Sequence, residues 1–250
     1  MLRCCICRQA VDRWLPHPLI DQRSEFMKLM DTIGSDLSVY QCPECGCNDR
    51  DRHLWLYLSA VGVLQDVRGT CVLHLAPEAH LEQLIAALQP AEYVRGDLHP
   101  LREGHVEIDV ERLPFADARF DLIICNHVLE HVASPQRALA ELHRCLRPAS
   151  LLIAQTPYSP RLKQTFELNE PVTAEFAKLF YGQEDHVRLF GADIVQYFHA
   201  AGFMGELLEH DTLLAGLDPK DHGCNRREPL FAFWKPPAPG SEPRREGAAL

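Results

Sequence analysis

The sequence predicts an α/β fold with a doubly wound, mostly parallel sheet, and three observations carry this prediction. From residue 71 onward, short apolar runs alternate with amphipathic segments, the pattern of a parallel sheet covered by helices on both faces. The length of 250 residues suits one such domain plus a small appendage. Paired cysteines near the N-terminus predict that the appendage is a small metal-binding segment.

Seven segments have the composition of strands. Apolar runs bounded by turn residues predict strands at 71–76, 93–96, 106–110, 120–125, 151–154, 206–214 and 230–234. Only about eight residues separate the second segment from the third, fewer than the dozen that a parallel crossover usually needs. Either a helix is reduced to a loop there, or one of these two strands is misplaced.

Helical spacing of apolar residues predicts helices at 23–33, 50–64, 78–88, 135–146 and 191–201. We expect three parts: a cysteine-bracketed segment over 1–48, a main domain over 49–235 and a Pro/Gly-rich, disordered tail over 236–250. The main domain carries a poorly periodic insertion at 158–190, placed where a lid over a substrate site is expected.

Composition narrows the classes of function. The formal net charge is −10, and residues 1–60 carry seven Lys/Arg against eight Asp/Glu with no basic run, which argues against a nucleic-acid partner. The sequence contains no run of the 18–20 apolar residues that a membrane span needs. The N-terminal stretch MLRCCICRQAVDRW has no apolar core typical of a signal peptide. We therefore expect a cytoplasmic protein with reduced cysteines.

Two CxxC motifs predict a zinc site. Cys4-x-x-Cys7 and Cys42-x-x-Cys45 form the paired ligand set of a tetrahedral structural Zn²⁺ site. CPECG also supplies the tight turn that such knuckles need. Two further cysteines, Cys5 and Cys47, compete as ligands. A four-cysteine site has no open coordination position, so we expect a structural role for it.

Polar side chains follow the predicted strands where each one ends. In an open parallel sheet, ligands bind outside the carboxyl ends of the strands, and an acid after the second strand can accept the hydroxyls of a ribose. This pattern predicts a nucleoside site. Its candidate residues are Ala76 and Glu78 after the first strand, Asp97 after the second with Leu98 beside it, Asp109 at the end of the third, and Asn126 and His127 after the fourth.

The central motifs resemble those of class I S-adenosylmethionine-dependent methyltransferases. The resemblance is carried by LPFADARFDLIICNHVLEHV (113–132) and LRPASLLIAQTP (146–157), and it covers roughly residues 70–213. It implies a Rossmann-like, seven-stranded sheet with a reversed final strand, and S-adenosylmethionine as cofactor. It further implies that Asp97 binds the ribose, that Asp109 and Val110 contact the adenine, and that Asn126 and His127 line the methionine side. YGQEDHVRLFG (181–191) resembles a feature of members with a zinc knuckle.

The first loop departs from the family pattern. Where the family has an acid and a Gly-rich turn, this chain reads VLHLAPEAH, with His74 in place of the acid and no glycine. S-adenosylmethionine has no pyrophosphate, so it does not need the glycine cradle that phosphates require. The absence of glycine argues strongly against NAD or ATP as the ligand. We expect Glu78 to pair with the ammonium group of the cofactor and so replace the lost acid.

Methyl transfer depends mainly on holding donor and acceptor in line, and a hydroxyl or amine acceptor also benefits from a nearby base such as histidine. The catalytic candidates are His131 and His186. Each has a plainer interpretation: His131 as a helix-start residue bonded to backbone, and EDHVR (184–188) as a surface ion-pair cluster.

Three functions remain open. The favoured one is O- or N-methylation of a small-molecule, glycan or natural-product acceptor, supported by the acidic charge and the lid-sized insertion. The second is an RNA methyltransferase whose zinc knuckle grips RNA. The third is a non-catalytic assembly or regulatory protein that has kept the fold, supported only by the glycine-free first loop.

Overall fold

A computed structural model describes residues 2–238 and 240 and has a seven-stranded sheet as its centre, in the order β3-β2-β1-β4-β5-β7-β6. The first five strands pair in parallel, whereas β7 is antiparallel to both β5 and β6. This confirms the predicted Rossmann-like fold with a reversed final strand. The strands are β1 (Cys71–Leu75), β2 (Glu92–Asp97), β3 (Val106–Glu107), β4 (Phe120–Cys125), β5 (Leu146–Ile153), β6 (Met204–Leu208) and β7 (Leu230–Trp234).

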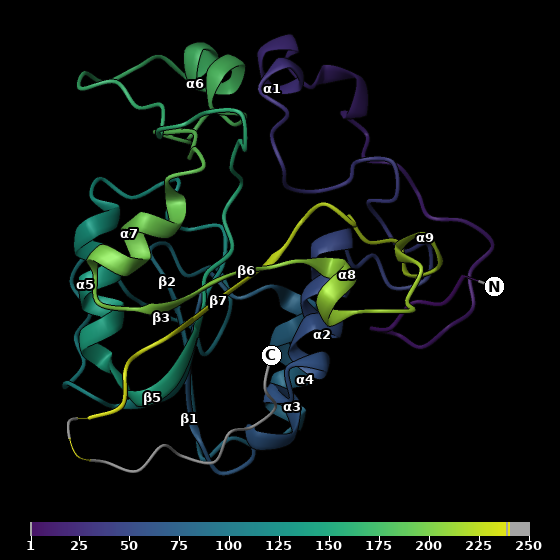
Figure 1. Cartoon of the computed structure of the whole chain (residues 1–250). Coiled ribbons are helices and arrows are strands. Elements are labelled where there is room, and N and C mark those ends of the chain that lie inside the picture. The colour runs from purple at the N-terminus through teal and green to yellow at the C-terminus, as the bar shows by residue number, and fades with distance from the viewer. Residues whose placement is uncertain (1, 239, 241–250) are drawn as a thin grey trace.

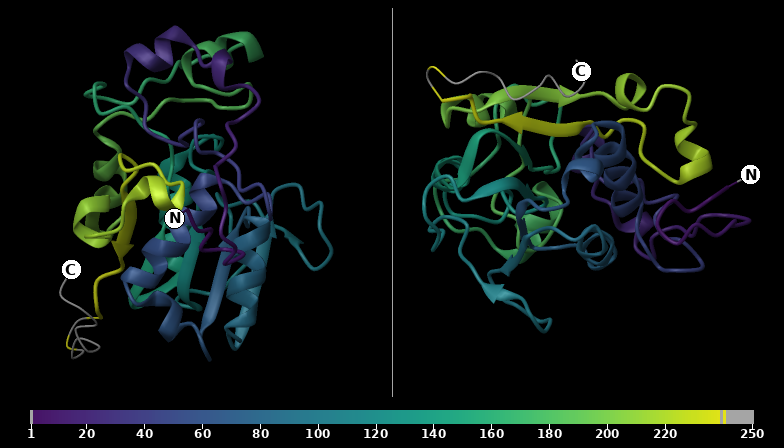
Figure 2. Two further views of the ribbon diagram at one scale, coloured as in Figure 1. Left: turned by 90° about the vertical axis from the view of Figure 1, so that its right-hand side faces the viewer. Right: turned by 90° about the horizontal axis from the view of Figure 1, so that it is seen from below.

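Helices cover both faces of the sheet (Figures 1 and 2). Side chains such as Leu73 pack on one face with α5 (Pro135–Cys145) and α7 (Ile194–Ala200). The neighbouring Val72 packs on the opposite face with α2 (Asp49–Ala60), α3 (Val63–Asp66) and α4 (Ala79–Ala87). The alternation of side chains along each strand therefore produces two cores, which explains why the strands read as continuous apolar runs.

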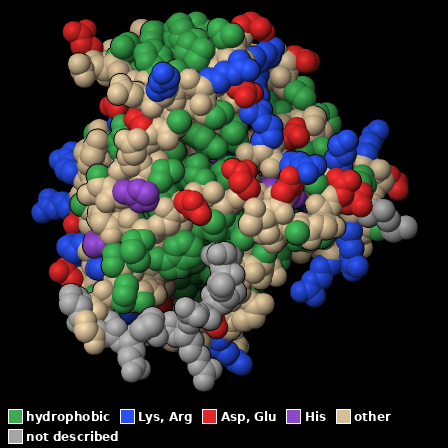
Figure 3. Space-filling model, in the orientation of Figure 1, with side chains coloured by type: hydrophobic (Ala, Val, Ile, Leu, Met, Phe, Trp, Pro, Cys, Tyr) green, Lys and Arg blue, Asp and Glu red, His purple; other side chains and the backbone are tan. Residues whose placement is uncertain are grey.

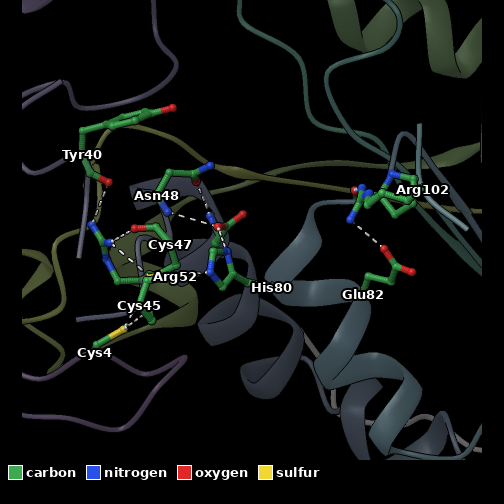
Figure 4. A network of polar contacts seen from close by, with 11 residues as sticks. Cys4, Tyr40, Cys45, Cys47, Asn48, Arg52, His80, Glu82 and Arg102 are labelled. Carbon is green, nitrogen blue, oxygen red and sulfur yellow. Dashed lines mark hydrogen bonds and ion pairs between the residues drawn. The ribbon is translucent and has the colours of Figure 1, made fainter. Parts of the chain in front are cut away.

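The short connection between β2 and β3 is a loop rather than a helix. The two strands share only two residue pairs, Gly96 with Val106 and Asp97 with Glu107. The loop between them is fastened to α4 because the Arg102 guanidinium donates to the Glu82 carboxylate at 2.8 Å (Figure 4). Of the two alternatives left open by the sequence, the helix reduced to a loop is therefore the correct one.

Three strand predictions were clearly wrong in their bounds. The strand expected over 206–214 ends at Leu208, and the chain continues as α8 (His210–Leu213), where His210 is buried and its Nδ1 lies 2.8 Å from Nε2 of His53. The strand over 106–110 keeps only two residues. β5 begins at Leu146 rather than 151, because Leu146 already pairs with Phe120 before a register shift.

The N-terminal segment and the insertion meet above the sheet. The helix expected over 23–33 is the shorter α1 (Glu25–Leu29), and the insertion, expected to be irregular, contains α6 (Ala174–Phe180). The two helices lie side by side at the top of Figure 1 and of the left view in Figure 2. Buried Met27 packs there with Ala177 and Tyr181. The insertion thus packs against a segment that is distant from it in the sequence.

The remaining short helices are η1 (Ile20–Gln22) and α9 (Pro219–His222). Most of the tail predicted to be disordered lies outside the described residues. Within the described part of the chain, no helix is long and apolar enough to cross a membrane.

Candidate active site

The carboxyl ends of β1, β2 and β4 lie at one level of the sheet. Leu75 is in register with Gly96 of β2 and with Cys125 of β4. The next residues, Ala76, Asp97 and Asn126, therefore emerge side by side. The strand order reverses between β1 and β4, so this edge is the switch point at which open α/β sheets bind their ligands.

Two residues at this edge adopt the left-handed conformation that favours glycine. Ala76 has a φ of 46° and His127 a φ of 54°, an arrangement that costs of the order of 1–3 kcal/mol each and clusters at functional sites. Backbone hydrogen bonds hold both residues, from Ala76 N to Gly96 O and from His127 N to Gln155 O, each at 2.7 Å. Ala76 thus adopts the backbone conformation that glycine normally provides in such a turn.

Glu78 joins the ends of β1 and β4. Its Oε2 lies 2.8 Å from Nε2 of His74, and its Oε1 accepts a hydrogen bond from Asn126 Nδ2 at 3.2 Å. Burial opposes ionisation of Glu78, but the hydrogen bond and charge of His74 prevail and lower the pKa of the Glu78 carboxyl to about 2. A negative charge is therefore held at this edge, although the first strand itself ends without an acid.

The two predicted aspartates differ in their surroundings. Asp97 is half-buried, its Oδ1 accepts from His99 N at 2.8 Å, and no described residue donates to its Oδ2. Asp109 is exposed, and its Oδ1 accepts from Glu111 N at 2.9 Å. Beside them, Val110 is buried and Leu98 is 54% exposed. Both aspartates follow strands of the same edge, at β2 and beyond β3.

A cavity of about 790 Å³ opens beside His127, within the size range of small-molecule sites. Its walls come from residues 17–40 of the N-terminal segment and residues 178–186 of the insertion. Among the predicted site residues, His127 and His186 line it. Since the other nucleoside candidates do not, the cavity adjoins the predicted methionine end of the edge.

His186 is buried in the wall of this cavity, with 3% of its surface exposed. Its Nδ1 lies 2.9 Å from the Tyr181 carbonyl oxygen, so Nδ1 carries the hydrogen. Its Nε2 is buried without a partner among the described residues. Burial lowers the pKa of His186, which keeps the ring neutral.

His131 lies next to His186, with the two rings edge to face and their centroids 4.6 Å apart. Between them and His127 lies Glu130, which sequence reasoning missed. Glu130 is 1% exposed; its Oε1 lies 3.4 Å from His127 Nδ1, and its Oε2 accepts from Thr156 Oγ1 at 2.8 Å. An acidic residue between the apolar residues of VLEHV (128–132) was the signal in the sequence that could have identified Glu130.

Burial opposes ionisation of Glu130 as well. The hydrogen bond and charge of His127 outweigh burial and lower the pKa of the Glu130 carboxyl to about 2. The group is therefore a buried carboxylate surrounded by imidazoles.

EDHVR is a surface ion-pair cluster only in part: Glu184 is exposed and pairs with Lys178 at 2.8 Å, whereas His186 and Arg188 are 3% and 1% exposed. The Arg188 guanidinium forms two hydrogen bonds of 2.9 Å with the Glu167 carboxylate and donates to the Leu129 and Val132 carbonyl oxygens. Arg188 thus ties the insertion to the loop that follows β4 and holds His186 beside Glu130.

A cysteine cluster lies in the N-terminal segment. The sulfur atoms of Cys4, Cys42, Cys45 and Cys47 lie within 4.8 Å of one another. Cys4 Sγ is 3.9 Å from Cys45 Sγ and 3.5 Å from Cys47 Sγ, close to the roughly 3.8 Å that separates the ligands of tetrahedral zinc. Cys7 is outside this group of four, although its thiol also interacts with those of Cys4 and Cys45.

The two CxxC motifs form turns of the same geometry. Arg8 N donates to Cys4 O at 2.8 Å, and Gly46 N donates to Cys42 O at 3.0 Å. The donor in each turn has a positive φ, of 65° and 78° respectively. In this correspondence Cys7 is the counterpart of Cys45, whereas Cys47 is the counterpart of Gln9. We refer to the two turns, residues 2–10 and 41–48, as the knuckle.

The knuckle is joined to the main domain through Arg52 of α2 (Figure 4). Arg52 is fully buried and donates to carbonyl oxygens on both sides, at 2.8 Å to Cys47 in the knuckle and at 2.7 Å to Gly223 beyond α9. Its guanidinium also lies over the Trp14 ring, 4.2 Å from the centroid. The knuckle is therefore packed against the main domain.

Comparison with known proteins agrees with this architecture. Residues 73–154 match the methyltransferase domain family. The chain is 32% identical over 123 residues to the 2-phytyl-1,4-naphtoquinone methyltransferase of Nostoc punctiforme, covering 48% of this chain and 47% of that protein. It is 37% identical over 67 residues to the malonyl-[acyl-carrier protein] O-methyltransferase of Enterobacter lignolyticus, covering 26% and 27%. It thus spans less than half of these relatives' lengths.

Among solved structures, the chain resembles one chain of the complex between the Trm112 methyltransferase activator of Haloferax volcanii and a methyltransferase. The TM-score is 0.51 with 16% identity, over 77% of this chain and 93% of that one. The fold is a Rossmann-like methyltransferase fold.

Proposed function

We propose that the protein is an S-adenosylmethionine-dependent methyltransferase that acts on a small-molecule acceptor by in-line transfer. The observation that carries the proposal is the juxtaposition of a polar edge at the β1/β4 switch point with a cavity of about 790 Å³ next to it. The edge suits a nucleoside cofactor and the cavity suits its acceptor.

The residues of the edge fit the cofactor. Asp97 is the last residue of β2, where an acid accepts both ribose hydroxyls, and one of its oxygens has no donor among the described residues. Glu78 is an ionised carboxylate whose oxygens retain lone pairs beyond their bonds to His74 and Asn126, so it can bind an ammonium group. We assign the ribose to Asp97, the adenine to Asp109 and Val110, and the methionine end to Glu78, Asn126 and His127, with Ala76 and Leu98 beside them.

The acceptor occupies the cavity between the knuckle-bearing segment and the insertion. S-adenosylmethionine supplies a methyl group on a positively charged sulfur, which any correctly placed nucleophile can attack. The chain's part is to hold the acceptor in line and to exclude water. His127 and His186 face this cavity, and His131 lies against His186, so we assign activation of the acceptor to His186 and His131.

A small acceptor is favoured over RNA. The net charge of −10 opposes a phosphate backbone, and the cavity is of small-molecule size. The two curated relatives described above are named for a naphthoquinone and for malonyl-[acyl-carrier protein], which supports an acceptor other than RNA and leaves O- and N-methylation open.

We further propose that the knuckle binds a structural Zn²⁺ ion through Cys4, Cys7, Cys42 and Cys45. Three of these belong to the sulfur cluster, and Cys7 is preferred to Cys47 because it occupies the position equivalent to Cys45 in the matching turn. Four thiolates leave no open position, so the ion has no part in methyl transfer.

Transfer of a labelled methyl group tests the function. The zinc-replete protein is incubated with methyl-labelled S-adenosylmethionine and separate panels of phenols, amines and carboxylates, and with bulk RNA. We expect label in at least one small-molecule class. Label in RNA alone would contradict the acceptor assignment, and cofactor binding without transfer to any class would favour a non-catalytic role.

A further inference from the structure

We propose a second metal site, distinct from the cysteine cluster, in which Glu130, His131 and His186 bind a divalent transition-metal ion at the wall of the acceptor cavity. One ligand atom of each residue lies within 4.8 Å of those of the other two. His186 lines the cavity of about 790 Å³, and His131 lines a neighbouring one of about 350 Å³. The site therefore lies between two spaces from which an ion and further ligands can approach.

The strongest indication is the Nε2 atom of His186. The Tyr181 carbonyl oxygen fixes the hydrogen on Nδ1, so Nε2 presents a lone pair. That atom is buried without any partner in the described part of the chain, and leaving such an atom unsatisfied costs about 1–3 kcal/mol. A histidine whose Nδ1–H is held by a carbonyl oxygen while Nε2 is free has the tautomer of a metal ligand.

Glu130 supplies the anionic ligand and is held in place by its own partners. Thr156 Oγ1 donates to Oε2 at 2.8 Å, and His127 Nδ1 lies 3.4 Å from Oε1. The Glu130 side chain is 98% buried. Ligating carboxylates are typically oriented by outer hydrogen bonds of this kind.

Two elements bring the ligands together. Glu130 and His131 follow β4, and His186 belongs to the insertion, which is tied to the same loop because Val187 N donates to Glu130 O at 3.0 Å. Arg188 makes further bonds to that loop. The site thus joins two segments that are more than 50 residues apart in the sequence. The ligands are therefore brought together by the tertiary fold, and not by their spacing along a single helix.

The donor set identifies the class of ion. Two imidazole nitrogens and one carboxylate oxygen suit borderline divalent ions such as Zn²⁺, Co²⁺, Mn²⁺ or Fe²⁺, whereas Mg²⁺ and Ca²⁺ prefer oxygen ligands alone. Three protein ligands leave coordination positions open, unlike the four thiolates of the knuckle. The ion is therefore placed to bind an oxygen atom of the acceptor.

This location deepens the proposed function, on which the following step rests. An acceptor hydroxyl bound to a divalent ion loses its proton to water more readily. The oxygen then forms a bond to the methyl carbon, the bond from that carbon to sulfur breaks, and sulfur keeps the electron pair. The acceptor class is accordingly an oxygen nucleophile, and His186 acts by holding the ion rather than by taking the proton.

Cobalt titration tests the site without requiring any methyl transfer. The full chain, with zinc already in the knuckle, is titrated with Co²⁺ and followed by calorimetry and by visible absorption. We expect one further equivalent of Co²⁺ with a spectrum of nitrogen and oxygen ligation and no thiolate charge-transfer band. His131→Ala, at a half-exposed position that tolerates truncation, abolishes this equivalent.

We expect Thr156→Val to weaken Co²⁺ binding by roughly 10–100-fold. His199 is an exposed histidine of α7, and His199→Ala is the matched control that leaves Co²⁺ binding unchanged. Absence of the additional equivalent, or a thiolate band showing that Co²⁺ has only exchanged into the cysteine cluster, overturns the proposal. Because neither cofactor nor acceptor is present, either result is independent of whether the protein is a methyltransferase.

Discussion

His80 Nε2 lies 2.9 Å from the carbonyl oxygen of Cys45. His80 belongs to the first turn of α4 and follows Glu78 by two residues, whereas Cys45 belongs to the second turn of the knuckle. Nδ1 of the same ring lies 3.2 Å from Asp51 of α2. Figure 4 shows this imidazole close to the knuckle residues Cys45 and Asn48. The order of the knuckle is thereby coupled to the position of Glu78.

Loss of the knuckle metal is expected to weaken cofactor binding. Cys42→Ser removes a buried member of the cluster, so zinc content should fall and S-adenosylmethionine should bind about tenfold more weakly, since outer supports typically contribute 10–100-fold. Metal content and calorimetry measure the two effects. Cys5→Ser is the matched control, because the Cys5 thiol donates instead to the Arg52 carbonyl oxygen. Zinc loss with unchanged cofactor affinity would refute the coupling.

The identity of the fourth zinc ligand gives a separate prediction. If the two turns act equivalently, Cys7→Ser lowers zinc affinity sharply and Cys47→Ser lowers it little, even though Cys47 is the more buried residue. Competition with a chromophoric chelator measures both affinities. The reverse order would assign the fourth position to Cys47.

Glu78 gives the protein a specific acid sensitivity. Its pKa is about 2 in the folded chain against an ordinary 4.5, so its ionised form stabilises the fold above pH 4.5. That contribution is lost as the pH falls from about 4.5 to about 2 and amounts to roughly 3 kcal/mol.

Glu78→Gln should therefore flatten the loss of unfolding free energy in this window, as urea titrations at several pH values measure. The same variant should bind S-adenosylmethionine about tenfold more weakly, because the ammonium loses its counter-charge. Glu103→Gln, at an exposed position of the β2–β3 loop, should change neither quantity. Wild-type cofactor affinity in Glu78→Gln would remove Glu78 from the site.

Arg188 fastens the insertion to the loop after β4. Arg188→Lys keeps the charge but loses the planar fork that bonds Glu167 and two carbonyl oxygens. We expect a loss of about 2–4 kcal/mol in unfolding free energy and faster proteolysis within 158–190. Arg161→Lys, at a 60% exposed side chain, is the control. Equal stability of the two variants would show that the insertion is not held through Arg188.

The two short helices above the sheet show why the contact between the N-terminal segment and the insertion was not predicted from the sequence. Hydrophobic side chains gather at the top of Figure 3, where α1 and α6 lie, and Leu29 and Leu179 are 61% and 46% exposed. Each helix is too short to show a clear period. Their partnership depends on Met27 and Tyr181, which are far apart in the chain, and single-sequence patterns carry no signal for such pairing.

The sheet and its polar edge, by contrast, were predictable from the sequence. Runs such as FDLIIC are apolar because both faces of β4 are covered, and polar residues directly after such runs fall at one edge. Glu130 was missed because its partners, His186 and Thr156, come from different elements. Its burial is decided by the tertiary fold and not by its neighbours in the chain.

The most direct test of the central claim is calorimetric titration of the zinc-replete protein with S-adenosylmethionine and S-adenosylhomocysteine, with Asp97→Ala in parallel. The account predicts binding of both ligands by the wild type, and its loss in Asp97→Ala without a change in thermal stability. Binding of neither ligand by the wild type, or equal binding by Asp97→Ala, would contradict the assignment of the β1/β4 edge as a cofactor site.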